Sequence, residues 1–345
     1  MKNSGIKYFE KAEAYRKSAE YGKAIALYQK ALAYFKKHSG IDGVLDCIIS
    51  LADTYRAKGD FVEAKGYYKD ALEVSGALDD ITAQADALAG LGLSLRALGD
   101  WQAALTLIGK AGKLYKTLHD KKGEAFSTWA RGGTYRIKGD IAKALKDYNA
   151  ALKQFNRLKD SSGAAYSYCG LGGSSRIAEK FNDSGKYYKR ANQMFIKLKD
   201  RFGLAYSYCG LGNVHRMKGD YKNALRYFKE AEVLYRKIGD SVSYAYTLWS
   251  VGTTYKMLGE SAKALESFKK SAELFAQTKD PRGQVYCILG IGELDWLSGR
   301  KATAKKAFSK ALKLTEKYRF SVEHGYAKRL LTAHEQGKGL PVNLP

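Results

Sequence analysis

Small and aromatic residues recur along the chain with a helical spacing that repeats every 40 positions. In most repeats an alanine is followed four residues later by a large apolar residue, and three residues further on by a second small residue. Ala144, Tyr148 and Ala151 form one such set, and similar sets run from Ala24 to Ala311. Spacings of four and three place side chains on one face of a helix. The pattern predicts amphipathic helices that approach each other closely through this face.

Two columns of turn residues on the same period divide each repeat into two helices. Gly-Asp at 59–60, 99–100, 139–140 and 219–220 supplies a left-handed glycine that ends one helix and an aspartate that caps the next. A second column of capping aspartates begins the other helix: Asp80, Asp120, Asp160, Asp200, Asp240 and Asp280. Each repeat is expected to hold two helices of roughly 16 residues. We call them the first helix (for example 201–218) and the second helix (for example 221–238) of a unit.

One repeat carries a consensus that resembles the tetratricopeptide repeat (TPR) family. The matching residues are Leu211, Gly212, His215, Ala224, Phe228 and Ala231. HEAT and armadillo repeats share the period but lack this order. The 40-residue period is similar to the variant found in Pins-type adaptors and kinesin light chains. The resemblance implies an all-α fold, a right-handed α-solenoid of eight TPR helix pairs plus a C-terminal capping helix.

The repeat also sets the expected domain organisation. We expect one superhelical domain over 1–336, made of 40-residue units and followed by a flexible tail, 337–345. The units are expected at about 1–40, 41–80, 81–120, 121–160, 161–200, 201–240, 241–280 and 281–320, and the capping helix at 321–336.

Composition narrows the class of protein. The chain has 345 residues, of which 45% are hydrophobic, and its net charge is +24. No apolar run is long enough to cross a membrane. Cys47, Cys169, Cys209 and Cys287 form no CxxC pair, so we expect reduced thiols, no metal site and a cytoplasmic location. The five histidines occupy unrelated positions and no phosphate loop occurs, so we expect a non-enzymatic protein without a cofactor.

The most informative column is basic and lies on the first helices, which in this family line the concave surface. We call it the cation column: Arg16, Arg56, Arg96, Arg136, Arg176, Arg216 and Lys256. Arginine presents a planar fork that suits carboxylates and phosphates. An acid three residues earlier, such as Glu13 or Asp53, offers Arg16 and Arg56 an internal partner. In units 4 to 7 that position holds Gly133, Gly173, Asn213 and Thr253. We therefore expect Arg136, Arg176, Arg216 and Lys256 to bind a partner, joined by Arg56 and Arg96.

Other residues on the same face extend the predicted groove. The aromatic ones are Phe126, Trp129, Tyr166, Tyr206, Tyr246, Trp249 and Tyr286. They suit two roles equally, contact with a ligand or packing against the adjacent repeat. Cys169 and Cys209 fit as small apolar lining. Gly133, Gly170, Gly173 and Gly210 inside first helices favour either a ligand backbone or close helix packing. Of the carboxylate-clamp positions known in the family, only Asn213 matches, so no binding of chaperone tails is expected.

Three functional hypotheses follow. The first is a protein–protein interaction scaffold or adaptor, whose groove binds an acidic, extended or helical segment of a partner. The second is a single-stranded RNA or other nucleic-acid binder, because one cation and one aromatic per repeat also suit phosphates and bases. The third is a self-assembling structural scaffold, in which the tail at 340–342 docks into a neighbouring copy. A monomer is expected under the first two.

Overall fold

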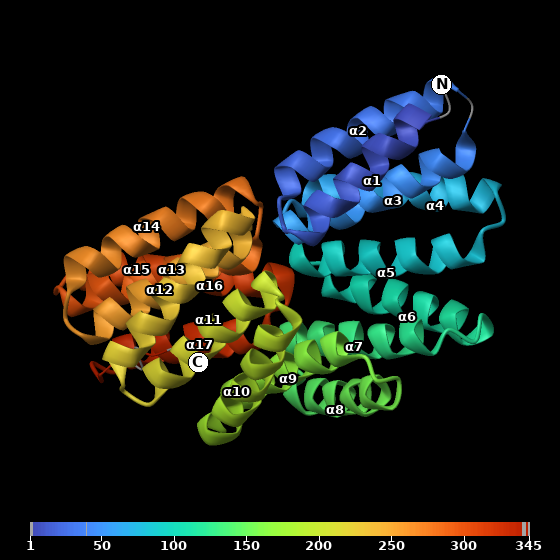
Figure 1. Ribbon diagram of the computed structural model, residues 1–345. Coiled ribbons are helices and arrows are strands. Elements are labelled where there is room, and N and C mark those ends of the chain that lie inside the picture. Colours follow the sequence, from blue (N-terminus) through green and yellow to red (C-terminus); the bar gives the residue numbers. More distant parts are fainter. Residues whose placement is uncertain (1–2, 39, 340–342, 344–345) are drawn as a thin grey trace.

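The chain folds into a superhelix of antiparallel helix pairs. The computed structural model describes residues 3–38, 40–339 and 343, and in this part of the chain it contains seventeen α-helices and no strand (Figure 1). The first helices of the units are α1 Asn3–Lys17, α3 Ile41–Lys58, α5 Ile81–Ala97, α7 Lys121–Lys138, α9 Ser161–Ile177, α11 Arg201–Met217, α13 Ser241–Met257 and α15 Pro281–Leu297. The second helices are α2 Tyr21–Lys37, α4 Phe61–Ala77, α6 Trp101–Thr117, α8 Ile141–Arg157, α10 Phe181–Leu198, α12 Tyr221–Ile238, α14 Ser261–Gln277 and α16 Lys301–Tyr318. The capping helix is α17 Ser321–Glu335, so the predicted fold is confirmed.

The turn columns act largely as the sequence predicts, except that Asp60 makes no side-chain hydrogen bond to the start of α4. Asp200 caps α11 by accepting a hydrogen bond from the Gly203 backbone N–H at 2.9 Å. The other aspartates of that column cap their helices in the same way. Gly59, Gly99 and Gly139 take φ values of 88°, 93° and 92°, a region that suits glycine. Where unit 5 lacks the glycine, Glu179 takes a left-handed φ of 59° in its place.

Aromatic rings of the second helices fill the space between neighbouring first helices. The buried ring of Tyr188 lies against Gly172 of its own unit and Gly210 of the next, and a Cβ on either glycine would clash with it. Tyr148 occupies the equivalent place beside Gly170. Of the two roles left open by the sequence, close packing is therefore the one observed at Gly170 and Gly210, where the packed rings leave no room for a ligand backbone.

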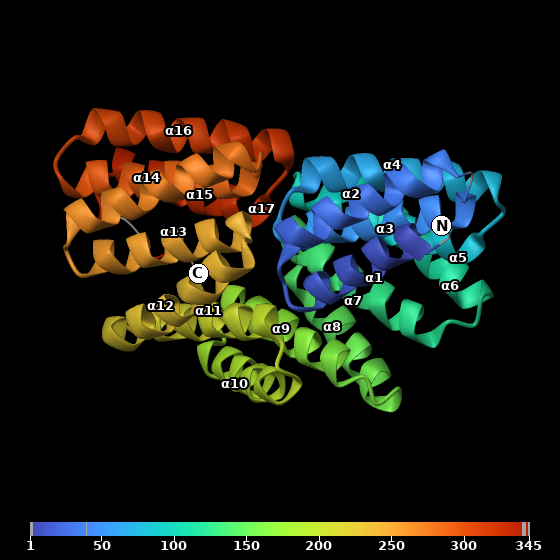
Figure 2. The same cartoon turned by 45° about the horizontal axis from the view of Figure 1, so that its top comes forward.

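The superhelix coils far enough to bring its ends together. Figures 1 and 2 show α1–α8 and α11–α17 as two stacks that lie side by side and are joined through α9 and α10. Trp101 at the start of α6 donates from Nε1 to the carbonyl oxygen of Tyr318 at 3.2 Å, although 217 positions separate them. The early units therefore touch the late ones, and the first helices surround a central space.

The C-terminal part of the chain closes the last unit. Tyr326 and Leu330 of α17 are buried against unit 8, and the Glu323 carboxylate pairs with Arg282 at 2.6 Å. Of the tail predicted over 337–345, residues 340–342 and 344–345 lie outside the described residues, including the segment that the self-assembly hypothesis invoked. None of the helices described is both long and apolar enough to cross a membrane.

Candidate functional site

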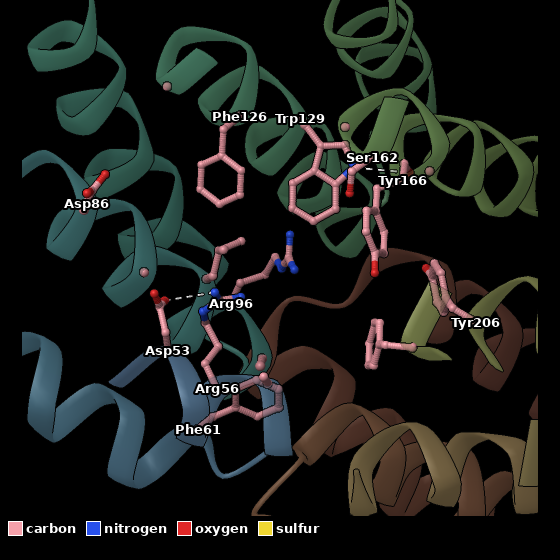
Figure 3. A pocket seen from close by; sticks show the side chains of 18 of the residues that line it. Asp53, Arg56, Phe61, Asp86, Arg96, Phe126, Trp129, Ser162, Tyr166 and Tyr206 are labelled. Carbon is pink, nitrogen blue, oxygen red and sulfur yellow. Dashed lines mark hydrogen bonds and ion pairs between the residues drawn. The ribbon is translucent and has the colours of Figure 1, made fainter. Parts of the chain in front are cut away.

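First helices of units 2 to 7 surround a cavity of about 1040 Å³ at the centre of the superhelix. This volume is slightly larger than the range of about 300–1,000 Å³ that is usual for small-molecule sites. Its lining comes mainly from α3, α5, α7, α9, α11 and α13, with the turns beside them and with residues of second helices such as Tyr68, Tyr115 and Tyr148. Figure 3 shows Arg56 and Arg96 pointing toward a space that Phe126, Trp129 and Tyr166 border from another side.

Three members of the cation column form one wall of this cavity: Arg56, Arg96 and Arg136. Arg56 has internal partners, because its Nη2 lies 3.1 Å from Asp53 Oδ1 and its Nε donates to the Tyr68 hydroxyl at 2.9 Å. Among the described residues, no carboxylate lies within ion-pair distance of Arg96 or Arg136. Arg96 Nη1 reaches only the Ala130 carbonyl, at 3.4 Å, and the buried Nε of Arg136 has no hydrogen-bond partner in the described part of the chain.

The surroundings of Arg96 and Arg136 differ in their effect on charge. Burial acts against the charge of Arg136, but the neighbouring Tyr206, Tyr148 and Tyr188 hold its pKa above the ordinary value, whereas the charge of Arg96 is left incompletely neutralised. Burial lowers the pKa of Arg96, and the like charges of Arg136 and Arg56 act in the same direction. Each guanidinium lies over a glycine of the next unit, where a Cβ on Gly133 would clash with Arg96 and one on Gly173 would lie 2.9 Å from Arg136 Nη1. Glycine at these positions leaves room for the guanidinium group and provides no carboxylate to pair with it. The wall is therefore suited to an anion.

The aromatic residues that border the cavity are held by contacts between units. Trp129 Nε1 donates to the Tyr166 carbonyl at 3.3 Å, and the Tyr166 hydroxyl donates to Asp200 at 2.7 Å. The Phe126 and Trp129 rings stack with their centroids 5.8 Å apart. Phe126, Trp129, Tyr166 and Tyr206 remain partly exposed to the cavity, so their packing between units leaves each of them a surface that faces the cavity.

Acidic residues that the sequence marks only as helix caps form the other end of the cavity. Asp120, Asp160, Asp200 and Asp240 line it, because the amino ends of the first helices converge there. Asp240 is buried, and burial raises its pKa to about 6. These aspartates repeat every 40 residues on the same first helices as the cation column, and this shared period was the sequence signal that both columns could line one cavity. From the sequence, these aspartates are expected to cap helices and nothing more.

The predicted cations of units 6 and 7 lie apart from the cavity, unlike Tyr206 of unit 6. Arg216 and Lys256 are buried, and neither lines the cavity. Arg216 donates to Asn213 Oδ1 at 3.2 Å and to the amide oxygen of Asn343 in the tail. Lys256 pairs with Glu293 of the next unit. Glu293 stands at the repeat position that Gly133 occupies in unit 4. The sequence-based expectation considered only acids on the same helix as each cation, so it did not include this ion pair between units 7 and 8.

Further predicted residues also belong to the core. Trp249 is buried, stacks on Tyr286 with a centroid distance of 4.7 Å, and donates from Nε1 to the Tyr286 carbonyl at 3.0 Å. The Tyr246 ring packs edge-on against the Phe275 ring, with a distance of 4.6 Å between the ring centroids. None of these three aromatics lines the cavity, so for them packing against the adjacent repeat is the role observed.

Two cysteines and one arginine complete the comparison with the sequence. Cys169 is fully buried, and Cys209 accepts a weak hydrogen bond from the Thr247 hydroxyl at 3.5 Å. Burial raises the pKa of both thiols. Neither cysteine lines the cavity. Arg176 lies outside the cavity as well, and its buried Nε has no hydrogen-bond partner among the described residues.

The fold and this cavity define a helical-repeat solenoid with an internal cavity. A family model described as tetratricopeptide repeat matches residues 5–77, 163–237 and 203–277, and a second such model matches 49–113. The first model alone covers more than half of the chain. The chain therefore belongs to the tetratricopeptide repeat family. No curated protein sequence matches it.

Solved structures with the same fold include two Rap proteins. A Rap protein complexed with competence and sporulation factor is 14% identical, with 96% of this chain and 98% of that chain covered and a TM-score of 0.64. The Rap conjugation gene regulator of the plasmid pLS20, in complex with the Phr* peptide, is 15% identical, with 94% and 99% covered and a TM-score of 0.56. At these identities the likeness shows the fold.

Proposed function

We propose that this protein is a non-catalytic adaptor whose central cavity binds a short acidic segment of a partner protein. Carboxylates of the segment pair with Arg96 and Arg136, and its apolar side chains contact Phe126, Trp129 and Tyr166. The observation that carries the proposal is the arginine wall of the cavity. Two of its guanidinium groups have no carboxylate partner among the described residues, and Arg136 keeps a buried, unpartnered Nε.

The physical argument is the cost of leaving these cations without an anion. Charges removed from water are stabilised only by paired groups and good hydrogen bonds. A carboxylate placed between Arg96 and Arg136 supplies both, in the bidentate geometry that arginine favours. The Rap structures support the proposal to the extent that the same fold is found in complex with a peptide. The residues proposed to bind the segment lie in units 3 to 5, whereas the sequence-based hypothesis placed the binding cations in units 4 to 7.

Fluorescence anisotropy with fluorescein-labelled hexaglutamate tests the proposal. We expect the double variant Arg96→Gln/Arg136→Gln to bind at least about tenfold more weakly than the unaltered protein, a loss of about 1.4 kcal/mol. The matched control is Arg157→Gln/Arg190→Gln, which removes the same charge from exposed positions on α8 and α10. The control should change the dissociation constant less than about twofold, because exposed charges act weakly at a distance in salt.

Two results would contradict the proposal. Equal losses in both double variants would mean that the positive charge acts without a specific site. Tighter binding of a fluorescein-labelled ten-residue oligouridylate, with a steep dependence on salt, would instead favour the nucleic-acid hypothesis. A net charge of +24 makes that comparison necessary.

A further inference from the structure

Turns of the early units contact the amino ends of late first helices in a regular series. We call this series the seam. It joins the turns at Ala19, Gly59, Gly99 and Gly139 to the starts of α11, α13, α15 and α17. A Cβ on Gly59 would lie 3.0 Å from Val242, and one on Gly99 would lie 2.9 Å from Pro281. In four successive units, the same turn position thus contacts the start of a late helix, which is a first helix in three cases and the capping helix in the fourth.

A few hydrogen bonds and one apolar cluster hold the seam. Arg201 Nη1 donates to the Ser18 carbonyl at 3.4 Å, Trp101 to the Tyr318 carbonyl, and the Ser321 hydroxyl to the Lys138 carbonyl. Ala19, Tyr21 and Ile238 are buried together, with Ala57 and Phe202 packed against them. These contacts are sparse beside the packing of consecutive helices, which runs the length of each helix.

The equivalent glycines of the later units lie outside the seam and serve as a comparison. Gly219, Gly259 and Gly299 hold the equivalent turn position with similar φ values of 79°, 77° and 82°. A Cβ at any of the three would meet no atom of the described structure within 4 Å. The contacts at Gly59, Gly99 and Gly139 therefore arise from the coiling of the whole superhelix and not from the local turn.

Both sides of the seam line the cavity. Tyr21 and Phe61 belong to the early side, whereas Phe202, Val242 and Ser243 belong to the late side. Separation of the seam would remove one wall of the cavity, while Arg96 and Arg136 would stay on the other. A ligand that touches both walls binds the closed superhelix more tightly than the open one, so it shifts the population toward closure.

We propose that the seam opens and closes as a unit, and that an acidic segment bound in the cavity holds it closed. In a solenoid each unit packs mainly on its neighbours, so small changes at each interface add up to a large displacement of the ends. The seam is the place where that displacement makes or breaks contacts. The part about the ligand depends on the proposed function, whereas the opening itself does not.

A disulfide across the seam tests closure. A Cβ on Gly139 would lie 3.3 Å from the Ser321 Cβ, close to the range of about 3.5–4.5 Å found in disulfides. We expect Gly139→Cys/Ser321→Cys to crosslink under mild oxidation, whereas Gly139→Cys alone should not. In the oxidised double variant, hexaglutamate should dissociate at least about tenfold more slowly than from the same protein after reduction, a difference of about 1.4 kcal/mol.

A matched pair of glycine variants tests opening. Asparagine tolerates a positive φ, so Gly99→Asn/Gly139→Asn and Gly219→Asn/Gly259→Asn carry similar backbone strain. Only the first pair places side chains into the seam. We expect the first pair to raise the radius of gyration in small-angle scattering and to speed hexaglutamate release about tenfold. The second pair should leave both quantities unchanged.

The outcomes separate the two halves of the proposal. If the double cysteine variant stays reduced and the seam variant scatters like the unaltered protein, the seam does not open and close and the proposal is wrong. If the superhelix opens but locked and open forms release hexaglutamate at one rate, the coupling to the ligand is wrong. If crosslinking and scattering behave as expected while no form binds hexaglutamate, the opening stands and the proposed function fails.

Discussion

The cation column has two regions that share a repeat position and differ in role. Arg96 and Arg136 line the cavity and have no carboxylate partner in the described structure, whereas Arg216 and Lys256 are buried within the packed core. For Arg96 and Lys256 the difference follows the residue that the next unit supplies 37 positions later, whereas Arg216, for which that residue is Thr253, bonds to Asn213 of its own helix. Gly133 stands there for Arg96, and Glu293 stands there for Lys256. Under the proposed function, one column thus serves binding in the early region and stability in the late region.

The late region behaves as part of a hydrophobic core. Glu293 accepts hydrogen bonds from Lys256 and from the Tyr326 hydroxyl of the capping helix, and all three are buried. Burial outweighs the attraction of Glu293 and lowers the pKa of Lys256. Such a pair is costly to break, because removal of one member leaves the other charge without compensation.

The largest expected effect comes from removing that carboxylate. Glu293→Ala should lower the free energy of unfolding by about 3–5 kcal/mol, since Lys256 is left buried without its acid. Urea denaturation followed by circular dichroism measures the change. The control is Asp295→Ala on the same helix, where the partner Arg300 is exposed, and the expected loss is about 0–1 kcal/mol. Equal losses would mean that the late region is no more core-like than the surface.

A second prediction concerns Asp240, which lies where the early and late regions meet. Burial raises its pKa from 3.8 to about 6, so the folded protein holds this proton more tightly than the unfolded chain. Stability from this group is present below about pH 4 and is lost as pH rises through about 6. Asp240→Asn keeps a helix cap and removes the charge. Its free energy of unfolding relative to the unaltered protein should rise by up to about 3 kcal/mol between pH 4 and 7.

Denaturation at a series of pH values measures that rise. Asp100→Asn is the control, because it removes a charge from an exposed helix cap. A constant difference between Asp240→Asn and the unaltered protein across the whole range would show that the carboxylate is not held protonated by burial.

A third prediction concerns a substitution that gives the early region the facing acid of the late region. Gly133→Glu places a carboxylate beside Arg96, as Glu293 stands beside Lys256. Hexaglutamate should then bind about tenfold more weakly, because Arg96 has an internal anion. Gly109→Glu adds the same charge on α6, where a Cβ meets nothing within 4 Å, and should change binding little. Unchanged affinity in Gly133→Glu would show that Arg96 does not contact the ligand.

The fold was predictable because it depends on local signals. The alanine, aromatic and aspartate columns fix helix faces and ends within each unit, and the structure follows them from α2 to α16. The site depends on contacts between units, which periodicity does not reveal. Arg216 looks like Arg136 in sequence, yet Asn213 and the Trp249 ring enclose it. Closure of the superhelix, which brings Gly139 to Ser321, depends on small rotations summed over several units.

The smallest expected effect tests whether the late region is a second site covered by the tail. Arg216 donates a hydrogen bond to Asn343, and its guanidinium also lies 5.6 Å from the Trp249 ring centre. Asn343→Ala removes only the contact with the tail, so Arg216 should stay enclosed and hexaglutamate affinity should change less than about twofold. Anisotropy titration measures this, with Asn149→Ala on α8 as the control. A gain of about tenfold would instead mean that Arg216 becomes available for binding and that the two regions differ by occupancy, not by packing.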